Sequence, residues 1–146
     1  MLQRAAVVWI ALLAVIFAGG CGSKPALVST PAKSLPPCAK AGPAVGLPPD
    51  FPSNFPLPPG AVITSSQRYE RGAIVVGGFI PLELKDAVAF FKGKLPAAGY
   101  QLLEGDAEMD EAESTFSGQG FRGKWKVNGL LNCPGVVALT IALSKP

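Results

Sequence analysis

The sequence predicts an α+β domain in which one helix packs on a face of a mainly antiparallel sheet, with the element order ββαββββ. Three observations predict it. Apolar residues alternate along residues 61–80 and again after residue 100, as they do in strands with one buried face. Residues 82–95 change to helical spacing. Eleven of the fifteen prolines lie between residues 22 and 60, so regular structure is expected only beyond that segment.

The first two strands are predicted at residues 61–69 and 73–80. The sequence Glu-Arg-Gly separates them at residues 70–72. Two alternating runs joined by a short segment that contains glycine are typical of a β-hairpin.

The helix is predicted at residues 82–95. Pro81 is expected to open it, since the fixed φ of proline suits the first turn. Pro96 is expected to kink or end it, and Gly99 suits the left-handed conformation that follows a last turn. One apolar stripe should face the sheet, with Ala87 beside Leu84, Val88, Phe91 and Leu95.

Four more strands are predicted, at residues 100–104, 114–118, 121–128 and 136–144. In the third of them, Phe121, Trp125 and Val127 should face the core, while Arg122, Lys124 and Lys126 point to the other side. Bases and aromatic rings on opposite faces cannot bind one nucleic-acid strand together, so no nucleic acid is expected. The basic row is expected to face acids of neighbouring strands, or alternatively anionic headgroups and wall polymers.

Two further motifs favour ordinary structural interpretations. Residues 118–123 match G-x-G-x-x-G, but a strand rather than a helix follows them, so their glycines are expected to let two strands turn. Residues 104–113 hold six acids. They fail the calcium-loop template, because Glu111 stands where glycine is needed and Ser117 where a glutamate is needed. A solvated connection between strands is predicted there.

Residues 1–20 are typical of a signal peptide. Arg4 supplies a positive charge, residues 5–18 are apolar, and two glycines precede Cys21. Fourteen apolar residues are fewer than the roughly 20 that a membrane span needs, although a retained anchor helix stays open as an alternative.

The sequence AGGC at residues 18–21 resembles the lipobox of bacterial lipoproteins. This resemblance implies that the sulfur of Cys21 carries diacylglycerol and that the chain is cut just before it. The implied location is the extracytoplasmic face of the cell membrane or outer membrane, with the membrane as a partner through the lipid anchor. Two acyl chains give stable anchoring.

The proline-rich segment divides into two parts. Residues 21–46 are predicted to be a tether between the lipidated cysteine and a single domain at residues 47–146. Leu47, Phe51, Phe55 and Leu57 are too apolar for a solvated linker, so this second part is expected to lie across the domain with its phenylalanines in the core. The sequences PPGA at 58–61, AFF at 89–91 and LPAAGY at 95–100 resemble a loose group of small bacterial lipoproteins and secreted domains. This resemblance implies a helix packed on a sheet, and it carries no information about activity.

The two remaining cysteines, Cys38 and Cys133, are expected to form a disulfide. An exported chain meets oxidising conditions, where an even pair of cysteines favours a bridge. The bridge would pin the end of the tether to the loop before the last strand.

The composition narrows the function. No histidine is present, which excludes Ser-His-Asp and Cys-His catalysis and imidazole-ligated zinc. We expect no cofactor and no metal. We expect a non-enzymatic binding or interaction module of the cell envelope, whose partner is an envelope protein, a wall polymer or a small ligand. A structural packing protein of the envelope and a histidine-free carboxylate hydrolase stay open as alternatives.

Overall fold

The computed structural model describes residues 34–146. The leader at 1–20, Cys21 and the tether as far as residue 33 lie outside the described residues. The described chain forms a six-stranded sheet with one α-helix, α1 (Leu84–Ala97). In chain order, the strands are β1 (Val62–Arg68), β2 (Ile74–Ile80), β3 (Tyr100–Ala107), β4 (Glu111–Gly118), β5 (Phe121–Gly129) and β6 (Val137–Ser144).

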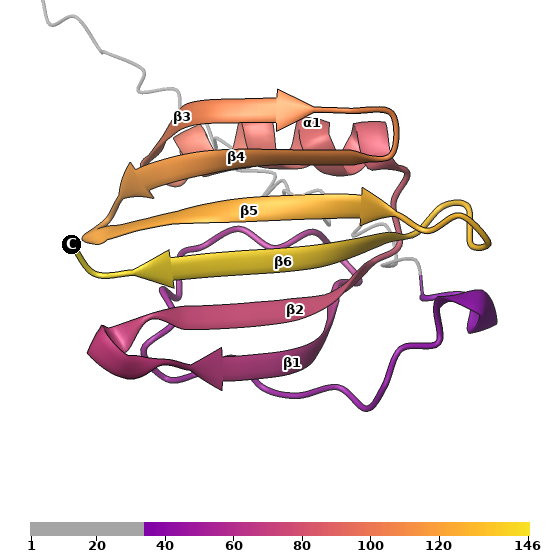
Figure 1. Ribbon diagram of the computed structural model, residues 1–146, viewed down its shortest axis with the longest axis horizontal. Helices are drawn as coiled ribbons and strands as arrows, with labels where there is room; N and C mark the ends of the chain where they lie inside the picture. The colour runs from indigo at the N-terminus through magenta and orange to yellow at the C-terminus, as the bar shows by residue number, and fades with distance from the viewer. Residues whose placement is uncertain (1–33) are drawn as a thin grey trace, which may run out of the picture. The chain divides into compact units, whose positions relative to one another are not determined.

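The spatial order of the strands is β1-β2-β6-β5-β4-β3, and every neighbouring pair is antiparallel (Figure 1). The last strand, β6, therefore lies between the β1–β2 hairpin and the β3–β4–β5 meander and joins them into one sheet. The predicted α+β class and the element order ββαββββ are confirmed.

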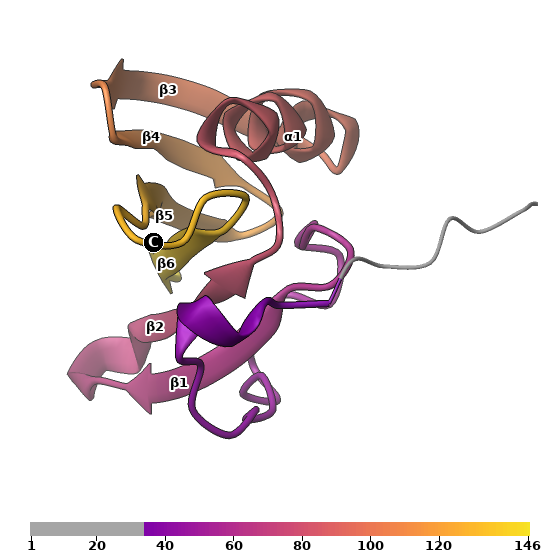
Figure 2. The ribbon, with the colours of Figure 1, turned by 90° about the vertical axis from the view of Figure 1, so that its right-hand side faces the viewer.

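The two faces of the sheet differ. The face we call the covered face carries the core and lies beneath α1 and residues 47–60 (Figure 2). Its fully buried side chains include Ile74 and Val76 of β2, Ile141 and Leu139 of β6, Trp125 and Val127 of β5, and Phe116 of β4. The opposite face, which we call the open face, carries the alternate residues of the same strands.

Helix α1 packs on the covered face above β3, β4 and β5. Ala87, Phe91 and Leu95 are fully buried, as the predicted stripe requires, and Leu84 and Val88 pack against the core. The expectation for Pro81 was wrong. The helix begins at Leu84, because residues 81–83 first turn the chain away from β2, with the Leu82 N–H bonded to the Ile80 carbonyl at 2.9 Å.

The other end of the helix follows the prediction closely. Pro96 lies in its last turn, and Gly99 has a φ of 86°. This is the left-handed conformation that glycine adopts without strain after a helix. Tyr100 follows at once and begins β3.

The proline-rich residues 47–60 contribute to the core. Phe51 and Phe55 are each 6% exposed, and the ring of Phe55 lies 5.5 Å from that of Tyr100. The Tyr100 hydroxyl donates to Asn54 Oδ1 at 3.1 Å, which ties this segment to β3. Leu47, at the start of the segment, is 40% exposed. It precedes the turn closed by the Phe51 N–H, and only after that turn does the segment point phenylalanines inward.

The predicted disulfide is confirmed. Cys38 and Cys133 are bonded, with their Cα atoms 5.4 Å apart. Cys133 forms a small second cluster with Ala39 and Val136, and Leu35, Phe79 and Leu130 pack against it. Farther along, the Val45 N–H donates to the Ile63 carbonyl at 2.8 Å. Residues 35–45 of the tether segment therefore contact the domain.

Candidate functional site

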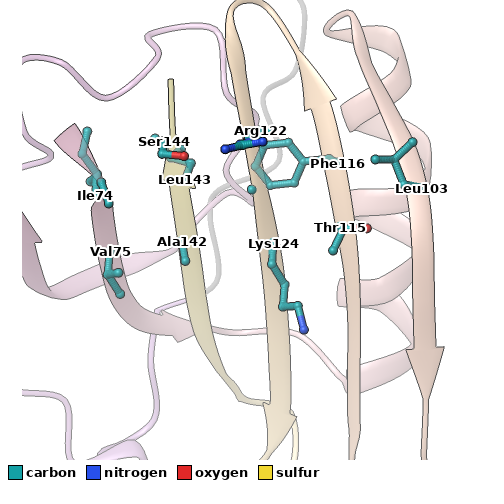
Figure 3. Close-up of a pocket in the computed structure, with 12 residues that line it drawn as sticks. Ile74, Val75, Leu103, Thr115, Phe116, Arg122, Lys124, Ala142, Leu143 and Ser144 are labelled. Carbon is teal, nitrogen blue, oxygen red and sulfur yellow. The ribbon is translucent and has the colours of Figure 1, made fainter. Parts of the chain in front are cut away.

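The open face holds a shallow groove of about 530 Å³ that crosses five of the six strands (Figure 3). Its lining comes from Val75 of β2, Ala142 of β6, Arg122 and Lys124 of β5, Thr115 of β4 and Leu103 of β3, among others. In Figure 3 these side chains stand on the side of the sheet away from the helix. The six residues named here alternate with the core, and the core residues Ile74, Phe116 and Leu143 also contribute to the lining.

Small residues on the central strands make the groove shallow. On β6, the open-face positions are Ala138, Thr140, Ala142 and Ser144, which alternate with the buried residues of the same strand. Gly77 of β2 pairs with Ser65 of β1, and a Cβ on Gly77 would lie 2.6 Å from the Ser65 hydroxyl. A larger side chain would therefore have to displace the Ser65 hydroxyl.

Larger apolar side chains flank this floor. Val75 is half-buried on one side, and Leu103 is 52% exposed on the other. At the opposite end of the open face, Phe79 packs against the cluster around Cys133. The disulfide-linked residues therefore cover one end of this face and leave the groove at the other.

The groove carries positive charge. Arg122 and Lys124 line it, and its lining includes no acidic residue. The Lys124 ammonium pairs with Glu113 Oε1 at 2.6 Å, at the edge of the groove. Arg122 makes no ion pair with an acidic side chain of residues 34–146. An anionic group in the groove could therefore pair with Arg122 without displacing an acidic side chain of residues 34–146.

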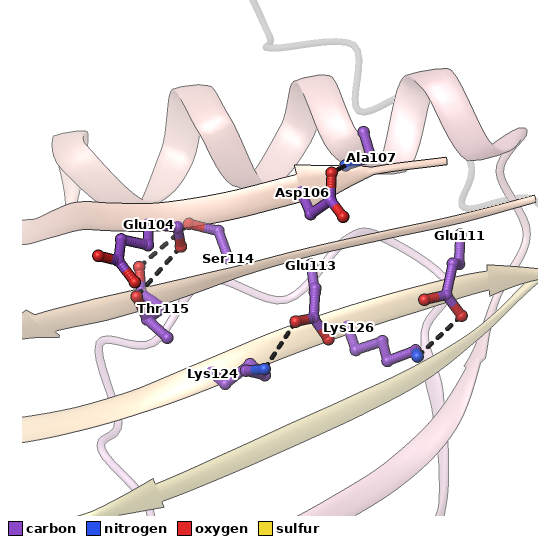
Figure 4. Close-up of polar contacts among 9 residues, drawn as sticks. All are labelled: Glu104, Asp106, Ala107, Glu111, Glu113, Ser114, Thr115, Lys124 and Lys126. Carbon is purple, nitrogen blue, oxygen red and sulfur yellow. Dashed lines mark hydrogen bonds and ion pairs between the residues drawn. The ribbon is translucent and has the colours of Figure 1, made fainter. Parts of the chain in front are cut away.

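Beside the groove, β4 and β5 form a ladder of ion pairs (Figure 4). Lys126 pairs with Glu111 Oε2 at 2.8 Å, and the Asn128 amide donates to the same oxygen at 2.8 Å. The hydrogen bond from Lys126 lowers the pKa of Glu111, and the same bond raises the pKa of Lys126. Lys124 and Lys126 of the basic row face acids of β4, as the sequence analysis expected, whereas Arg122 lies opposite Ser117.

This ladder corrects the prediction for residues 104–113. They are not a solvated connection: β3 extends to Ala107, β4 begins at Glu111, and only residues 108–110 form the turn. Pairing with lysines on β5 lets Glu111 and Glu113 occupy strand positions that their low strand propensity disfavours. A catalytic acid needs a raised pKa, whereas the pKa of the Glu111 carboxyl is lowered by its hydrogen bond with Lys126. Residues 34–146 hold no group of three acids or cysteines placed to bind a metal ion.

The other predicted positions fall into three places. Cys21 lies outside the described residues. Cys38 and Cys133 meet in the disulfide. The glycine motif forms the β4–β5 hairpin, where Gln119 and Gly120 have φ values of 53° and 77°. Two successive positive φ values are the mark of a two-residue type I′ turn, so the interpretation of these glycines as turn residues is confirmed.

The sequence analysis did not find the groove. Its only signal is the size of the residues that alternate with the core on β2 and β6, and that pattern is weak because small residues are common on exposed strands.

Within residues 34–146, no helix has the length and apolar character of a membrane span. No family model, curated protein or solved structure matches the chain.

Proposed function

We propose that this chain is a lipoprotein anchored by Cys21 on the extracytoplasmic side of a membrane, and that its domain is a non-enzymatic interaction module. The open-face groove is its docking surface, and the occupant is an envelope protein that presents a carboxylate beside apolar side chains. The observation that carries the proposal is Arg122, a cation without an acidic partner in residues 34–146, in a groove with an apolar floor.

The shape of the groove favours a protein surface over a small ligand. Neighbouring strands lie about 4.8 Å apart, so a groove across five strands is about 19 Å wide. A small ligand needs a site that encloses most of its surface, whereas this groove is shallow and wide. Arginine beside apolar residues is typical of the centre of a protein–protein interface.

The disulfide supports the extracytoplasmic location, because such bridges persist in oxidising compartments. It also limits the reach of the anchor. With Cys38 bonded to the β5–β6 loop, the spacer that follows Cys21 is residues 22–37. At about 3.1 Å per residue in polyproline II geometry, this spacer spans at most about 50 Å.

A photo-crosslinking experiment in living cells tests the docking surface. A benzophenone amino acid replaces Ala142, which lines the groove, or Ala97, an exposed alanine at the end of α1. We expect a protein adduct of one discrete mass from position 142 and none from position 97. The charge reversal Arg122→Glu should remove the adduct, whereas Lys94→Glu on α1 should preserve it.

Four results would contradict the proposal. The adduct could survive Arg122→Glu unchanged, or form equally from both positions, which would mean that the contact is not made by the groove. An adduct made of two copies of this chain would show self-association instead. An adduct with a wall polymer, recognised by its loss on digestion of the wall, would assign the groove to a different class of partner.

A further inference from the structure

The end of the sheet next to the disulfide exposes two large apolar side chains on neighbouring loops. Met109, in the turn between β3 and β4, is 99% exposed, and Leu131, in the loop between β5 and β6, is 92% exposed. These are the highest exposed fractions among the large apolar residues that the structure describes. Single exposed apolar residues are ordinary, whereas several at one place mark a contact with a protein or a membrane.

The two loops are bonded to each other. The Gly129 N–H donates to the Asp110 carbonyl at 2.7 Å, so Met109 is one residue and Leu131 two residues away from a single hydrogen bond. In Figure 1 the β3–β4 turn and the β5–β6 loop lie at the same end of the sheet. Met109 and Leu131 therefore belong to one surface, formed by residues 108–110 and 130–133, which we call the loop end.

The segment that leads to the proposed anchor joins the domain at this same end. Cys38 is bonded to Cys133 of the β5–β6 loop, and Leu35 packs against the cluster around Cys133. In the proposed lipoprotein, residues 22–37 connect the loop end to the lipid on Cys21. A short spacer keeps a linked surface at millimolar effective concentration, so even a weak affinity of the loop end for lipid populates the contact.

The loop end carries unbalanced negative charge. Glu108 and Asp110 flank Met109, and neither forms an ion pair with a basic side chain of residues 34–146. The exposed Lys40, two residues after Cys38, offsets at most one of these charges. An anionic lipid surface would repel the two carboxylates, whereas the ammonium group of a zwitterionic headgroup can pair with them. The charges therefore favour a zwitterionic surface such as phosphatidylethanolamine.

The docking groove lies toward the other end of the sheet. Its lining includes Leu143 and Ser144, the last two residues of β6, with their cross-strand partners Ile74 and Arg122. The β5–β6 loop, by contrast, precedes the first residue of β6. A contact between the loop end and lipid therefore leaves the groove free for its partner.

We propose that the loop end rests on a zwitterionic lipid surface, with the side chains of Met109 and Leu131 among the headgroups. Insertion is favourable because it removes apolar area from water. The inference rests on the proposed lipid anchor at Cys21. It adds the orientation of the domain, with the loop end toward the bilayer and the docking groove away from it.

A tryptophan at the loop end tests the contact. The mature chain is reconstituted in vesicles of phosphatidylethanolamine and phosphatidylcholine whose phosphatidylcholine carries bromine, a quencher of indole emission, on its acyl chains. We expect strong quenching of Leu131→Trp, since an indole suits the membrane interface. Tyr69→Trp, at an exposed position at the other end of the sheet, should keep its emission. Trp125 is 1% exposed and gives the same background in both chains.

Further changes in the Leu131→Trp chain assign the contact to the loop end. Met109→Ser should lower the quenched fraction several-fold, because the second apolar contact is lost, while Leu103→Ser in the middle of β3 should leave it unchanged. Replacing phosphatidylethanolamine by the anionic phosphatidylglycerol should also lower the quenched fraction. The double change Glu108→Gln with Asp110→Asn should then restore it.

Mass spectrometry of the same chains separates two kinds of failure. A chain that retains Met1 and an unmodified Cys21 overturns the proposed anchor, and this inference with it. A lipidated chain whose position 131 is quenched no more than position 69, or is quenched equally on anionic vesicles, overturns the inference alone. Emission at position 131 that shifts to shorter wavelength without quenching would mean that another protein copy covers the loop end, which also overturns it.

Discussion

The two faces of the sheet carry alternate residues of the same strands and differ in side-chain size and charge. On β6, Leu139 and Ile141 are buried beneath the covering layer, while Thr140 between them is exposed on the open face. The covered face carries large apolar side chains under α1 and residues 47–60. The open face carries small residues, a cation without an acidic partner in the described chain, and a ladder of ion pairs. The comparison shows that alternate residues of one strand can build a packed core on one face and an exposed, charged surface on the other.

The largest expected difference is between neighbouring residues of β6. Leu139→Ala should lower the free energy of unfolding by about 2–5 kcal/mol, because it removes buried methyl groups and leaves a cavity. Thr140→Ala, on the open face, should change it by less than about 0.5 kcal/mol. Urea unfolding of the oxidised protein, followed by circular dichroism, measures both. Equal losses would mean that Thr140 on the open face is also packed against other side chains.

Removing the disulfide should enlarge the open face. The double change Cys38→Ala with Cys133→Ala should cost about 2–4 kcal/mol, because it frees the unfolded chain from a loop of 95 residues. It should also release residues 34–39 and uncover Phe79, which packs beside the bridge. Hydrogen exchange should then rise at residues 34–39 and 130–136 and stay unchanged in β4. Unchanged exchange beside the bridge would contradict this account.

A smaller effect is expected from pH on the ion-pair ladder. The pKa of Glu111 is lower in the folded protein than in the unfolded chain, so its contribution is complete above the unfolded pKa of about 4.3. It is lost as the pH falls through the lowered folded pKa. Glu111→Gln should therefore flatten the acid side of the stability curve, and Glu70→Gln in the β1–β2 turn should leave it as steep. Urea midpoints measured between pH 2 and pH 6 check the difference.

The smallest effect on stability is expected at the groove itself. Arg122→Ala removes a side chain that makes no ion pair with an acid of residues 34–146, so it should shift the free energy of unfolding by less than about 0.5 kcal/mol. The same change should abolish docking if the proposed function is right. Thermal unfolding measures the first part. A large loss of stability would mean that Arg122 supports the fold rather than a partner.

The covered face was the more predictable of the two. Strict alternation in β6 and the helical stripe of α1 indicate which residues are buried, because large apolar residues have to leave water. The sequence also indicated that Phe51 and Phe55 belong to the core and that Cys38 meets Cys133. The position of β6 between β2 and β5 was not predictable, since it depends on which edge strand of the hairpin and which edge strand of the meander the last strand pairs with.

The groove on the open face was harder to foresee. The groove depends on which residues lie side by side on five strands, and strand order is needed before Arg122 and Ala142 can be placed together. Misplacing the acids of residues 104–113 in a loop concealed the β3–β4 hairpin and the register that pairs Gly105 with Ser114 and Ser114 with Trp125.

The most direct test compares thiol labelling of one position in cells and in the purified full chain. With Cys21 lipidated and the other two cysteines bridged, Ala142→Cys adds the single free thiol, and Ala97→Cys provides the matched control. A maleimide that cannot cross the cytoplasmic membrane should react with both variants in cells, but several-fold more slowly at position 142 than in the purified chain, while position 97 reacts equally in the two settings. Equal rates at position 142 would show that nothing occupies the open face, and labelling that requires lysis would place the domain in the cytosol.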